Sequence, residues 1–237
     1  LFNKNLAMFP DAITVRGKRH ILALAKSNIK GGILFVVHND LPDYFLPEYH
    51  VDPEFAKTLY SHRNEILIKA IGIKWNDDLT FKNKIKTLSI PWNIYERESK
   101  DAGSYLLILK NNKSKRIMIG KLGEIFFKEG FYIYVGSAMK NLQARLERHK
   151  RKRKKLFWHI DYLREEADLI QLIPIRSLIR YECELAKRIK DIADGYIEGF
   201  GVSDCSCISH LFYVDKNPLE KSDFIETILF FRMAIVI

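Results

Sequence analysis

The stretch FYIYVGSAMKNLQARLERH, Phe131–His149, decides how the second half of this chain of 237 residues is interpreted. Its apolar start predicts a strand, Gly136 is expected to open a turn, and the remainder has the composition of a helix. Tyr134 stands at the end of the strand. Arg145 and His149 are four residues apart and therefore share one face of the helix. The stretch predicts a strand–turn–helix unit with polar side chains at its strand end and on one helix face.

Short apolar runs separated by Gly, Lys and Asn come before this stretch and predict a β-meander. Its first strand begins at Gly103-Ser104-Tyr105. After the stretch, Glu182 lies in a predicted helix. The expected strands span residues 104–110, 116–120, 123–127, 131–136 and 169–176, and the expected helices span about 140–152, 158–166 and 178–191.

Four motifs in this half carry a family resemblance. They are YVGSA at 134–138, WHIDYL at 158–163, ECELA at 182–186 and GFGVSDCSCISHLF at 199–212. With them, the second half resembles the GIY-YIG nuclease superfamily, and most closely a family of small GIY-YIG-like domains from bacteria and archaea. The four motifs together are far more specific than the short YVG sequence alone.

The resemblance implies an active site. In the superfamily, tyrosines on two neighbouring strands, an arginine on the next helix and a glutamate on a later helix act together, which here implies Tyr105, Tyr134, Arg145 and Glu182. Three features depart from the superfamily pattern. The first motif reads Gly-Ser-Tyr, the turn before Arg145 has one additional residue, and the long separation of the tyrosines leaves room for an extra hairpin.

The chemistry of phosphodiester hydrolysis suits these residue types. Glu182 is a hard oxygen ligand for Mg²⁺ or Mn²⁺, and Arg145 offers fixed donors to charge developing on the phosphoryl group. Tyr134 or Tyr105 can accept the proton of the attacking water once a cation lies nearby, because the pKa of a free tyrosine is about 10. The alternative is that both tyrosines are ordinary strand residues and that Glu182 is a solvated acid.

Two histidines are further candidates for the site. His149 shares the helix face of Arg145. His159, in WHIDYL, is either an additional acid–base group or a core histidine hydrogen-bonded to the backbone, and we favour the structural role.

The charge of the chain points to a polyanionic partner. The net charge is +10 and the pI about 9.4, which favours nucleic acid or an anionic membrane surface. Seven of the eight residues in RHKRKRKK are basic, directly after the helix that carries Arg145. A duplex backbone is the expected partner, and a merely solvated face is the alternative. The predicted nucleic-acid contacts are Arg148, Lys150, Arg151, Lys152, Arg153, Lys154 and Lys155.

The three cysteines, Cys183, Cys205 and Cys207, are an odd number gathered late in the chain. This pattern does not suit a secreted disulfide framework, and with no signal peptide at the start we expect a cytoplasmic protein. Cys205, Cys207 and His210 have C-x-C-x-x-H spacing, whereas Cys183 stands elsewhere. A zinc site needs four ligands, so this cluster is either a zinc site or a packed loop with reduced thiols.

The first half has α/β character. We expect a helix over residues 11–28 with Asp11 as N-cap, a buried strand over 32–38, a helix start at Asp52-Pro53, and extended segments over 65–75 and 79–90. A polar segment at 91–103 marks the domain boundary. The predicted organisation is 1–92, a linker at 93–102, a second domain at 103–218 and a C-terminal helix or tail at 219–237.

Residues 6–90 resemble the C-terminal part of the sugar fermentation stimulation protein family, most specifically at FPDA (9–12) and RGKRH (16–20). The resemblance implies an OB-fold DNA-binding domain followed by a PD-(D/E)xK nuclease domain, whose acidic motif should lie just upstream. Residues 1–10 contain no acid, and the chain begins with Leu1. Either the gene begins earlier or this half is a scaffold. Arg16 and His20 are one helical turn apart and either face that site or form a basic helix surface.

The expected fold class is therefore α/β (α+β): a truncated PD-(D/E)xK-like half domain, then a GIY-YIG-like domain with a small antiparallel sheet flanked by helices. The expected function is a metal-dependent endonuclease acting on nucleic acid, with DNA as the expected partner. One rival is a DNA-binding or regulatory protein without catalysis. Another is a peripheral membrane protein using the apolar tail TILFFRMAIVI, which is too short to span a bilayer and is interrupted by Arg232.

Overall fold

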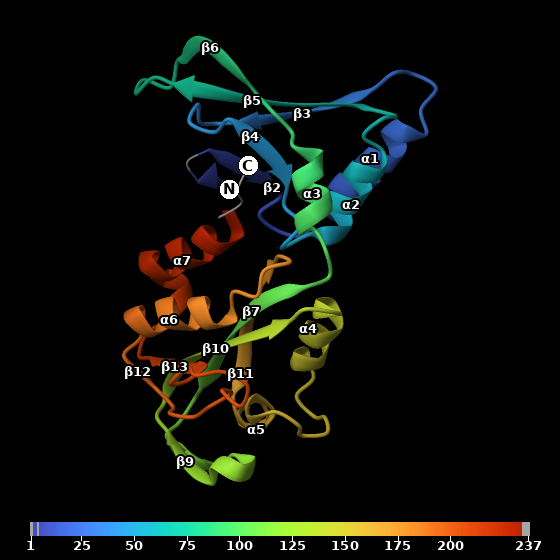
Figure 1. The fold of residues 1–237 in the computed structure, drawn as a ribbon. Helices are drawn as coiled ribbons and strands as arrows, with labels where there is room; N and C mark the ends of the chain where they lie inside the picture. Colours follow the sequence, from blue (N-terminus) through green and yellow to red (C-terminus); the bar gives the residue numbers. More distant parts are fainter. Residues whose placement is uncertain (1, 4, 234–237) are drawn as a thin grey trace. The chain divides into compact units, whose positions relative to one another are not determined.

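The computed structural model describes residues 2–3 and 5–233, and leaves out the side chains of residues 2, 3 and 81–84. The chain divides into two compact units, one formed by Leu1–Ser99 and one that begins at Lys100 (Figure 1). Each unit has its own sheets and its own buried core. The fold is mixed α/β. None of the helices in the described part of the chain is long and apolar enough to cross a membrane.

The first unit contains two three-stranded sheets and three helices. One sheet has the order β1-β2-β4 and the other β3-β5-β6, and each combines a parallel with an antiparallel pair. The strands are β1 (Phe2–Asn3), β2 (Leu6–Phe9), β3 (Gly32–Val37), β4 (Tyr44–Pro47), β5 (Leu67–Trp75) and β6 (Phe81–Leu88), and the helices are α1 (Val15–Ala25), α2 (Pro53–Ser61) and α3 (Trp92–Glu98).

Two helices of this unit, α1 and α2, begin at residues whose side chains cap them. The prediction for α2 is confirmed, because Asp52 caps it by accepting the amide of Phe55, with Pro53 in the first turn. The expectation of Asp11 as N-cap of α1 is wrong. The hydroxyl of Thr14 accepts the amide of Gly17 instead, so α1 begins at Val15.

Two other expectations for the first unit need correction. Strand β3 is not buried, since its residues alternate between exposed and half-buried and Leu34 and Val36 project outward. The segment expected as a linker at 93–102 mostly forms α3. It is ordered because Ile94 and Tyr95 are buried in the first unit, a packing that the polar residues around them conceal in the sequence.

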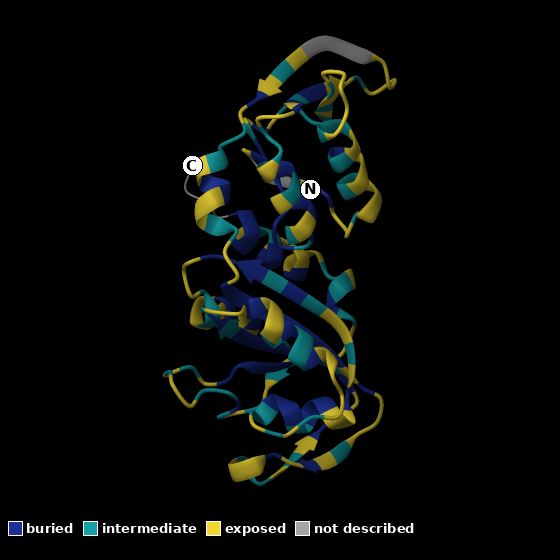
Figure 2. Ribbon diagram, turned by 90° about the vertical axis from the view of Figure 1, so that its right-hand side faces the viewer, coloured by how far each residue is buried: buried dark blue, intermediate teal, exposed yellow. Residues whose placement is uncertain are grey.

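The second unit is built on a five-stranded antiparallel sheet with the order β11-β7-β10-β13-β12. Helices α4 and α5 contribute to the core on one face, and α6 and α7 to the core on the other. Strands β7, β10 and β13 are mostly buried, whereas the edge strands β11 and β12 are partly exposed, and Figure 2 colours buried residues dark blue and exposed residues yellow. The strands are β7 (Gly103–Asn111), β10 (Gly130–Ala138), β11 (Asp168–Arg176), β12 (Gly195–Tyr196) and β13 (Leu211–Val214), and the helices are α4 (Leu142–Lys150), α5 (His159–Glu166), α6 (Glu182–Ile192) and α7 (Ser222–Met233).

The two central strands read as continuous apolar runs because both faces of the sheet are covered. Along β7, Tyr105, Leu107 and Leu109 face the α4–α5 side, whereas Leu106 and Ile108 face the α6–α7 side. In β10, Tyr132 and Tyr134 likewise face α4 and α5. This alternation places both candidate tyrosines on one face of the sheet.

The predicted β-meander is wrong. Strand β7 pairs directly with β10, and the intervening residues leave the sheet as a separate hairpin of β8 (Lys115–Met118) and β9 (Glu124–Phe127), joined through the 3₁₀ turn η1 (Gly120–Leu122). An extra hairpin at this place matches the long separation of the two tyrosines. The apolar C-terminal stretch forms α7 up to Met233, preceded by the 3₁₀ turn η2 (Pro218–Glu220), and residues 234–237 of the expected tail lie outside the described part.

Candidate functional site

The two candidate tyrosines lie side by side on neighbouring strands. Tyr105 is aligned with Gly136 and Tyr134 with Leu107, and the centroids of the two tyrosine rings are 6.4 Å apart. Gly136 does not open a turn as expected, because β10 continues to Ala138. A Cβ at Gly136 would lie 2.5 Å from Cζ of Tyr105, so glycine is required for the ring to lie against β10.

Helix α4 brings an arginine and a histidine to these rings. The hydroxyl of Tyr105 lies 2.9 Å from Nε2 of His149, within hydrogen-bond distance. The guanidinium of Arg145 stacks over the ring of Trp158 at 4.0 Å. Burial raises the pKa of Tyr105, and the charge of Arg145 and its hydrogen bond to the hydroxyl partly oppose that rise. Arg145 therefore lies close enough to the Tyr105 hydroxyl to favour its ionisation.

Glu182 is the first residue of α6 and approaches the site from another element. The hydroxyl of Ser137, on β10, donates to Oε2 of Glu182 at 2.6 Å. The charge of Glu182 contributes to raising the pKa values of Tyr105 and Tyr134, although burial is the larger cause in both. The structure thus brings together Tyr105, Tyr134, Arg145 and Glu182, the residues implied by the family resemblance.

His149 belongs to the same group. Its ring is almost fully buried, and burial lowers its pKa to about 3, so the imidazole is neutral near pH 7. Its Nδ1 is buried and has no hydrogen-bond partner among the described residues. A neutral imidazole next to a phenol can either accept or donate the shared proton.

His159 makes a backbone contact, as the structural alternative expects. Its Nδ1 accepts the amide of Gly201 at 3.3 Å, and its ring meets Phe200 edge-on at 5.6 Å. Phe200 also meets Tyr134 edge-on. His159 therefore ties the loop after β12 to α5, one aromatic ring away from the candidate site.

The basic segment divides into internally paired and outward-facing side chains. Arg148 donates to both oxygens of Asp161 at 2.8 Å, and Nζ of Lys154 lies 3.1 Å from the same carboxylate. Asp161 is fully buried. Burial opposes its ionisation, yet the hydrogen bonds from Arg148, the Trp158 amide and Lys154 outweigh it and hold the pKa well below its usual range. Arg148 and Lys154 therefore hold α4 and α5 together, and their role as phosphate contacts stays a prediction.

The other five basic side chains of the segment are exposed. Lys150 and Lys152 lie near Glu147 and Asp168 in surface ion pairs, which contribute little in water. Arg151, Arg153 and Lys155 form no such pair within the described residues. They line a surface hollow of about 540 Å³ together with Arg148, Lys154, Ala144 and Phe157.

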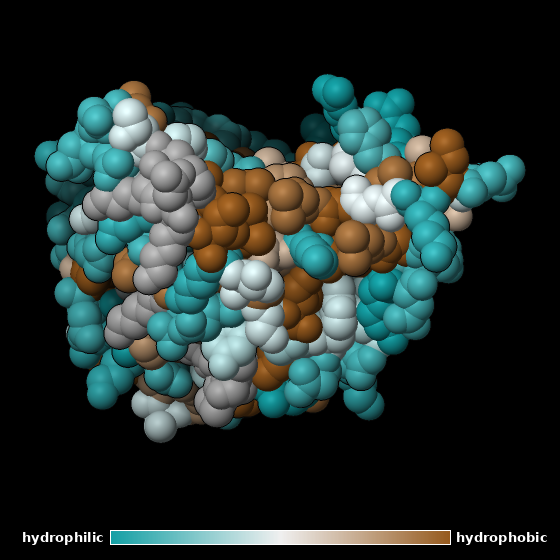
Figure 3. All heavy atoms as spheres, turned by 90° about the horizontal axis from the view of Figure 1, so that it is seen from above, coloured by the Kyte–Doolittle hydropathy of each residue, from teal (hydrophilic) through white to brown (hydrophobic). Residues whose placement is uncertain are grey.

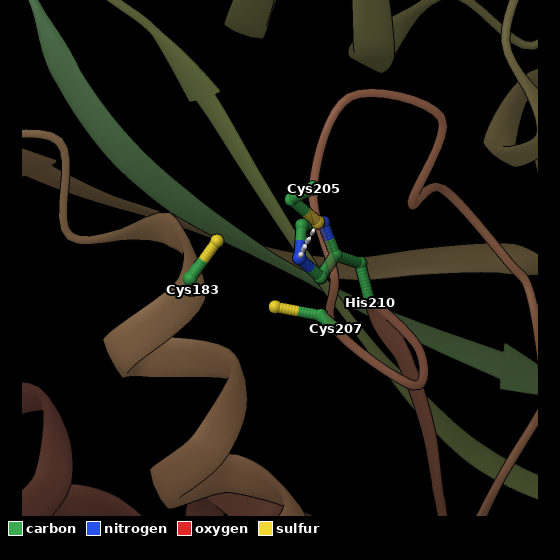
Figure 4. Close-up of side chains that lie close together, drawn as sticks. All are labelled: Cys183, Cys205, Cys207 and His210. Carbon is green, nitrogen blue, oxygen red and sulfur yellow. Dashed lines mark hydrogen bonds between the residues drawn. The ribbon is translucent and has the colours of Figure 1, made fainter.

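The cysteines form a second group next to Glu182. Cys183, Cys205, Cys207 and His210 present ligand atoms that all lie within 4.8 Å of one another (Figure 4). The sequence interpretation separated Cys183 from the C-x-C-x-x-H motif, but the N-terminal turn of α6 brings it to that loop. The one available signal was the position of Cys183 directly after the candidate catalytic glutamate.

The first unit shows no comparable group. Within the described residues, no cluster of three or more His, Cys, Asp or Glu side chains in this unit is spaced to hold a metal. Its buried Asp52 accepts the amides of Thr14 and Phe55 and so acts in capping. Arg16 and His20 are both exposed on α1. His20 lines an apolar hollow of about 710 Å³ between α1, α2 and strands β2 and β3. Figure 3 looks onto this unit and shows apolar side chains gathered on its surface.

The fold and the site define a mixed α/β protein whose second unit gathers two tyrosines, an arginine, a histidine and a glutamate from β7, β10, α4 and α6. The family described as "Domain of unknown function DUF123" matches residues 104–231, more than half of the chain, and the chain belongs to that family. The family described as "Sugar fermentation stimulation protein RE domain" matches residues 1–78, at the N-terminal end.

Relatives of the first unit carry the same description. A sugar fermentation stimulation protein homolog of Magnetococcus marinus is 41% identical over 73 residues, which are 28% of this chain and 32% of that protein. The homolog of Methanothermobacter thermautotrophicus is 40% identical over 62 residues, 25% of this chain and 26% of that one. The chain thus spans about a third or less of the length of these curated relatives.

A solved structure is also similar to part of the chain. It is the structure of Pyrococcus furiosus SfsA in complex with Ca²⁺, 26% identical, covering 38% of this chain and 40% of that one, with a TM-score of 0.34.

Proposed function

We propose that the second unit is a GIY-YIG-type endonuclease domain that hydrolyses phosphodiester bonds in nucleic acid, with DNA as the expected substrate. The observation that carries the proposal is the convergence of Tyr105, Tyr134, Arg145 and Glu182 from four separate elements. The four residues are of the types, and lie on the kinds of element, that the family resemblance implies for the active site. His149 adds a neutral imidazole in contact with one tyrosine.

The donor set fits a divalent metal. Glu182 is partly exposed at 14%, and each carboxylate oxygen has two lone pairs, so its bond from Ser137 leaves acceptor sites for a cation. A single carboxylate suits Mg²⁺ or Mn²⁺, which keeps most of its waters. When bound, the ion supplies charge neutralisation at the phosphoryl oxygens and a more acidic water.

The protein groups have distinct tasks in the proposed reaction. The attacking water gives its proton to the phenolate of Tyr105, which forms once a nearby cation lowers the pKa of the phenol, while the water oxygen forms a bond to phosphorus. The neutral imidazole of His149 holds the Tyr105 oxygen in place through Nε2. Arg145 donates to the phosphoryl oxygens as their charge grows. The bond from phosphorus to the leaving oxygen then breaks, and that oxygen takes a proton from the hydroxyl of Tyr134.

Burial of the two tyrosines opposes the ionisation that this reaction requires. Tyr105 is 1% exposed and Tyr134 8% exposed, and burial raises the pKa of both phenols. The charge of Arg145 opposes that rise at both phenols, and its hydrogen bond adds to the opposition at Tyr105, so Tyr105 is the more readily ionised of the two. The same burial favours a second candidate function, a nucleic-acid-binding module in which the group is structural.

The proposed binding surface is the exposed part of the basic segment. Arg151, Arg153 and Lys155 border the hollow beside α4, the helix that carries Arg145. Phosphate contacts there would position a strand without reading its sequence. The first unit is proposed to act as a scaffold that adds nucleic-acid affinity through Arg16, which is exposed on α1.

The two candidate functions are separated by one assay. The purified full chain is incubated with supercoiled plasmid DNA, and separately with structured RNA, with Mg²⁺, Mn²⁺ or a chelator. Metal-dependent nicking that follows the folded protein through a gel-filtration column supports the endonuclease. Binding in a gel-shift assay without cleavage of either polymer under any metal condition supports the binding module.

A further inference from the structure

We propose that Cys183, Cys205, Cys207 and His210 bind one structural zinc ion, which fixes the loop after β12 to the start of α6. Three thiols and an imidazole whose ligand atoms lie within 4.8 Å of one another form a ligand set of the Cys₃His class that zinc prefers. In Figure 4 the sulfur atoms and the imidazole ring face a common centre from two separate segments. The inference concerns folding and does not depend on the proposed nuclease activity.

The separations suit a tetrahedral ion. With zinc–sulfur bonds near 2.3 Å and zinc–nitrogen bonds near 2.0–2.1 Å, tetrahedral geometry places a sulfur and a nitrogen ligand about 3.6 Å apart. The Sγ of Cys205 lies 3.5 Å from Nε2 of His210. The remaining ligand pairs, at up to 4.8 Å, need only small side-chain rotations to close around an ion.

The second nitrogen of His210 links the cluster to Glu182. Nδ1 of His210 is buried, makes no hydrogen bond among the described residues and points to Oε1 of Glu182 at 3.7 Å. Histidines that bind a metal through one nitrogen commonly present the other N–H to a carboxylate, which fixes the ring orientation. A zinc on Nε2 would therefore place a proton on Nδ1 and direct it at Glu182.

The loop that carries three of the ligands has no regular secondary structure that would hold it in place. Residues 197–210 contain no helix or strand, and they join the two-residue strand β12 to β13. Loops longer than about 12 residues without secondary structure usually have a functional or binding role. Four protein ligands would close the coordination shell, which is typical of a structural rather than a catalytic zinc.

The first experiment measures metal in the full chain purified without a polyhistidine tag. Elemental analysis should find about one zinc per chain, as expected for a closed four-ligand site. Replacing zinc with Co²⁺ should produce the intense visible bands of tetrahedral cobalt and the near-ultraviolet band of cobalt–thiolate bonds. This spectrum is recorded on the wild-type protein and therefore does not depend on the folding of any variant.

Variants then test which ligands are used. Cys183→Ser is the decisive one, because Cys183 lies outside the C-x-C-x-x-H motif, and it should weaken Co²⁺ or Zn²⁺ binding at least about tenfold, as loss of a ligand or its support does. Cys205→Ser should do the same. Ser206→Ala, an exposed position between the two loop cysteines, is the matched control and should bind metal like the wild type.

Three results would overturn the proposal. One is a folded wild-type chain that holds less than about a tenth of an equivalent of zinc and shows no cobalt–thiolate band. Another is a disulfide among the three cysteines in protein purified without reductant, seen as a chain two hydrogens lighter in intact-mass analysis. The third is a Cys183→Ser variant that retains wild-type metal affinity.

Discussion

The hydroxyl of Tyr105 lies 2.9 Å from Nε2 of His149, although the two residues are 44 positions apart in the chain. Tyr105 is buried in β7 and His149 is buried in the last turn of α4, so the two side chains bond to each other rather than to bulk water. The contact turns a strand tyrosine and a helix histidine into one proton-sharing pair. Both proposed chemistry and stability should therefore respond to changes at His149.

The first prediction concerns catalysis. His149→Asn should lower the single-turnover rate of Mg²⁺-dependent cleavage by about 10²-fold, because His149 positions the Tyr105 hydroxyl and a misplaced reacting group costs about that much. The affinity for nucleic acid should change little, since His149 is buried. The rate is compared with that of His20→Asn, an exposed histidine in the first unit. Equal rates for the wild type and His149→Asn would remove the imidazole from the reaction.

The second prediction concerns acid stability. Burial lowers the pKa of His149 from its usual 6.5 to about 3, so the unfolded chain binds a proton that the folded chain does not. Stability from the neutral ring is fully present above pH 6.5 and declines as the pH falls from 6.5 towards 3. Urea unfolding of the wild type should show this decline, and His149→Asn should show a shallower one. Parallel pH profiles for the two proteins would contradict a buried neutral imidazole.

The third prediction concerns Asp161. Asp161→Asn should lower the free energy of unfolding by about 3–5 kcal/mol, because it leaves Arg148 and the mostly buried Lys154 without their carboxylate. Glu165→Gln, an exposed acid on the same helix, is the control and should change stability by less than about 0.5 kcal/mol. Urea unfolding measures both. A loss no larger than that of the control would show that the ion-pair group is not structural.

The fourth prediction concerns nucleic-acid affinity. Arg151, Arg153 and Lys155 are exposed and border one hollow, so replacing all three with Ala should reduce the log–log salt slope of binding by about 2.7 and weaken binding to all sequences alike. The control is the triple Ala variant of Lys121, Lys187 and Lys216, which removes the same charge elsewhere in the second unit. Salt titrations of DNA binding from about 50 to 200 mM measure the slopes. Equal slopes in the two triple variants would make the segment an ordinary solvated surface.

Sequence patterns predicted the parts of this protein that depend on local order. Periodicity predicted α4 and α5 to within about two residues, and Asp52-Pro53 predicted the start of α2, because a helix is decided by neighbours within a turn or two. Helix α6 was also predicted, but it begins at Glu182 rather than near residue 178. The family resemblance that the four motifs carry implied Tyr105, Tyr134, Arg145 and Glu182, and the fold places these residues near one another. How each of them takes part in chemistry stays a prediction.

Sequence patterns could not predict which side chains far apart in the chain would contact one another. Asp161, on α5, forms ion pairs with Arg148 and Lys154. Nothing in RHKRKRKK distinguishes those two basic residues from the others. The approach of Cys183 to Cys205 likewise follows from the packing of α6 on the sheet. Gly136 resembles a turn residue in sequence, yet it is needed inside β10 because a tyrosine from β7 covers it.

Cleavage by Glu182→Gln tests the central claim most directly. The substitution keeps the size of the side chain and removes the charge of the carboxylate that would hold the metal, whereas Glu184→Gln changes an exposed acid two residues further along the same helix. The measurement is the single-turnover rate of plasmid nicking with Mg²⁺, with DNA affinity measured in parallel. The account predicts a loss of about 10²–10³-fold or more for Glu182→Gln, near-wild-type cleavage for Glu184→Gln and unchanged binding in both. Wild-type cleavage by Glu182→Gln would contradict it.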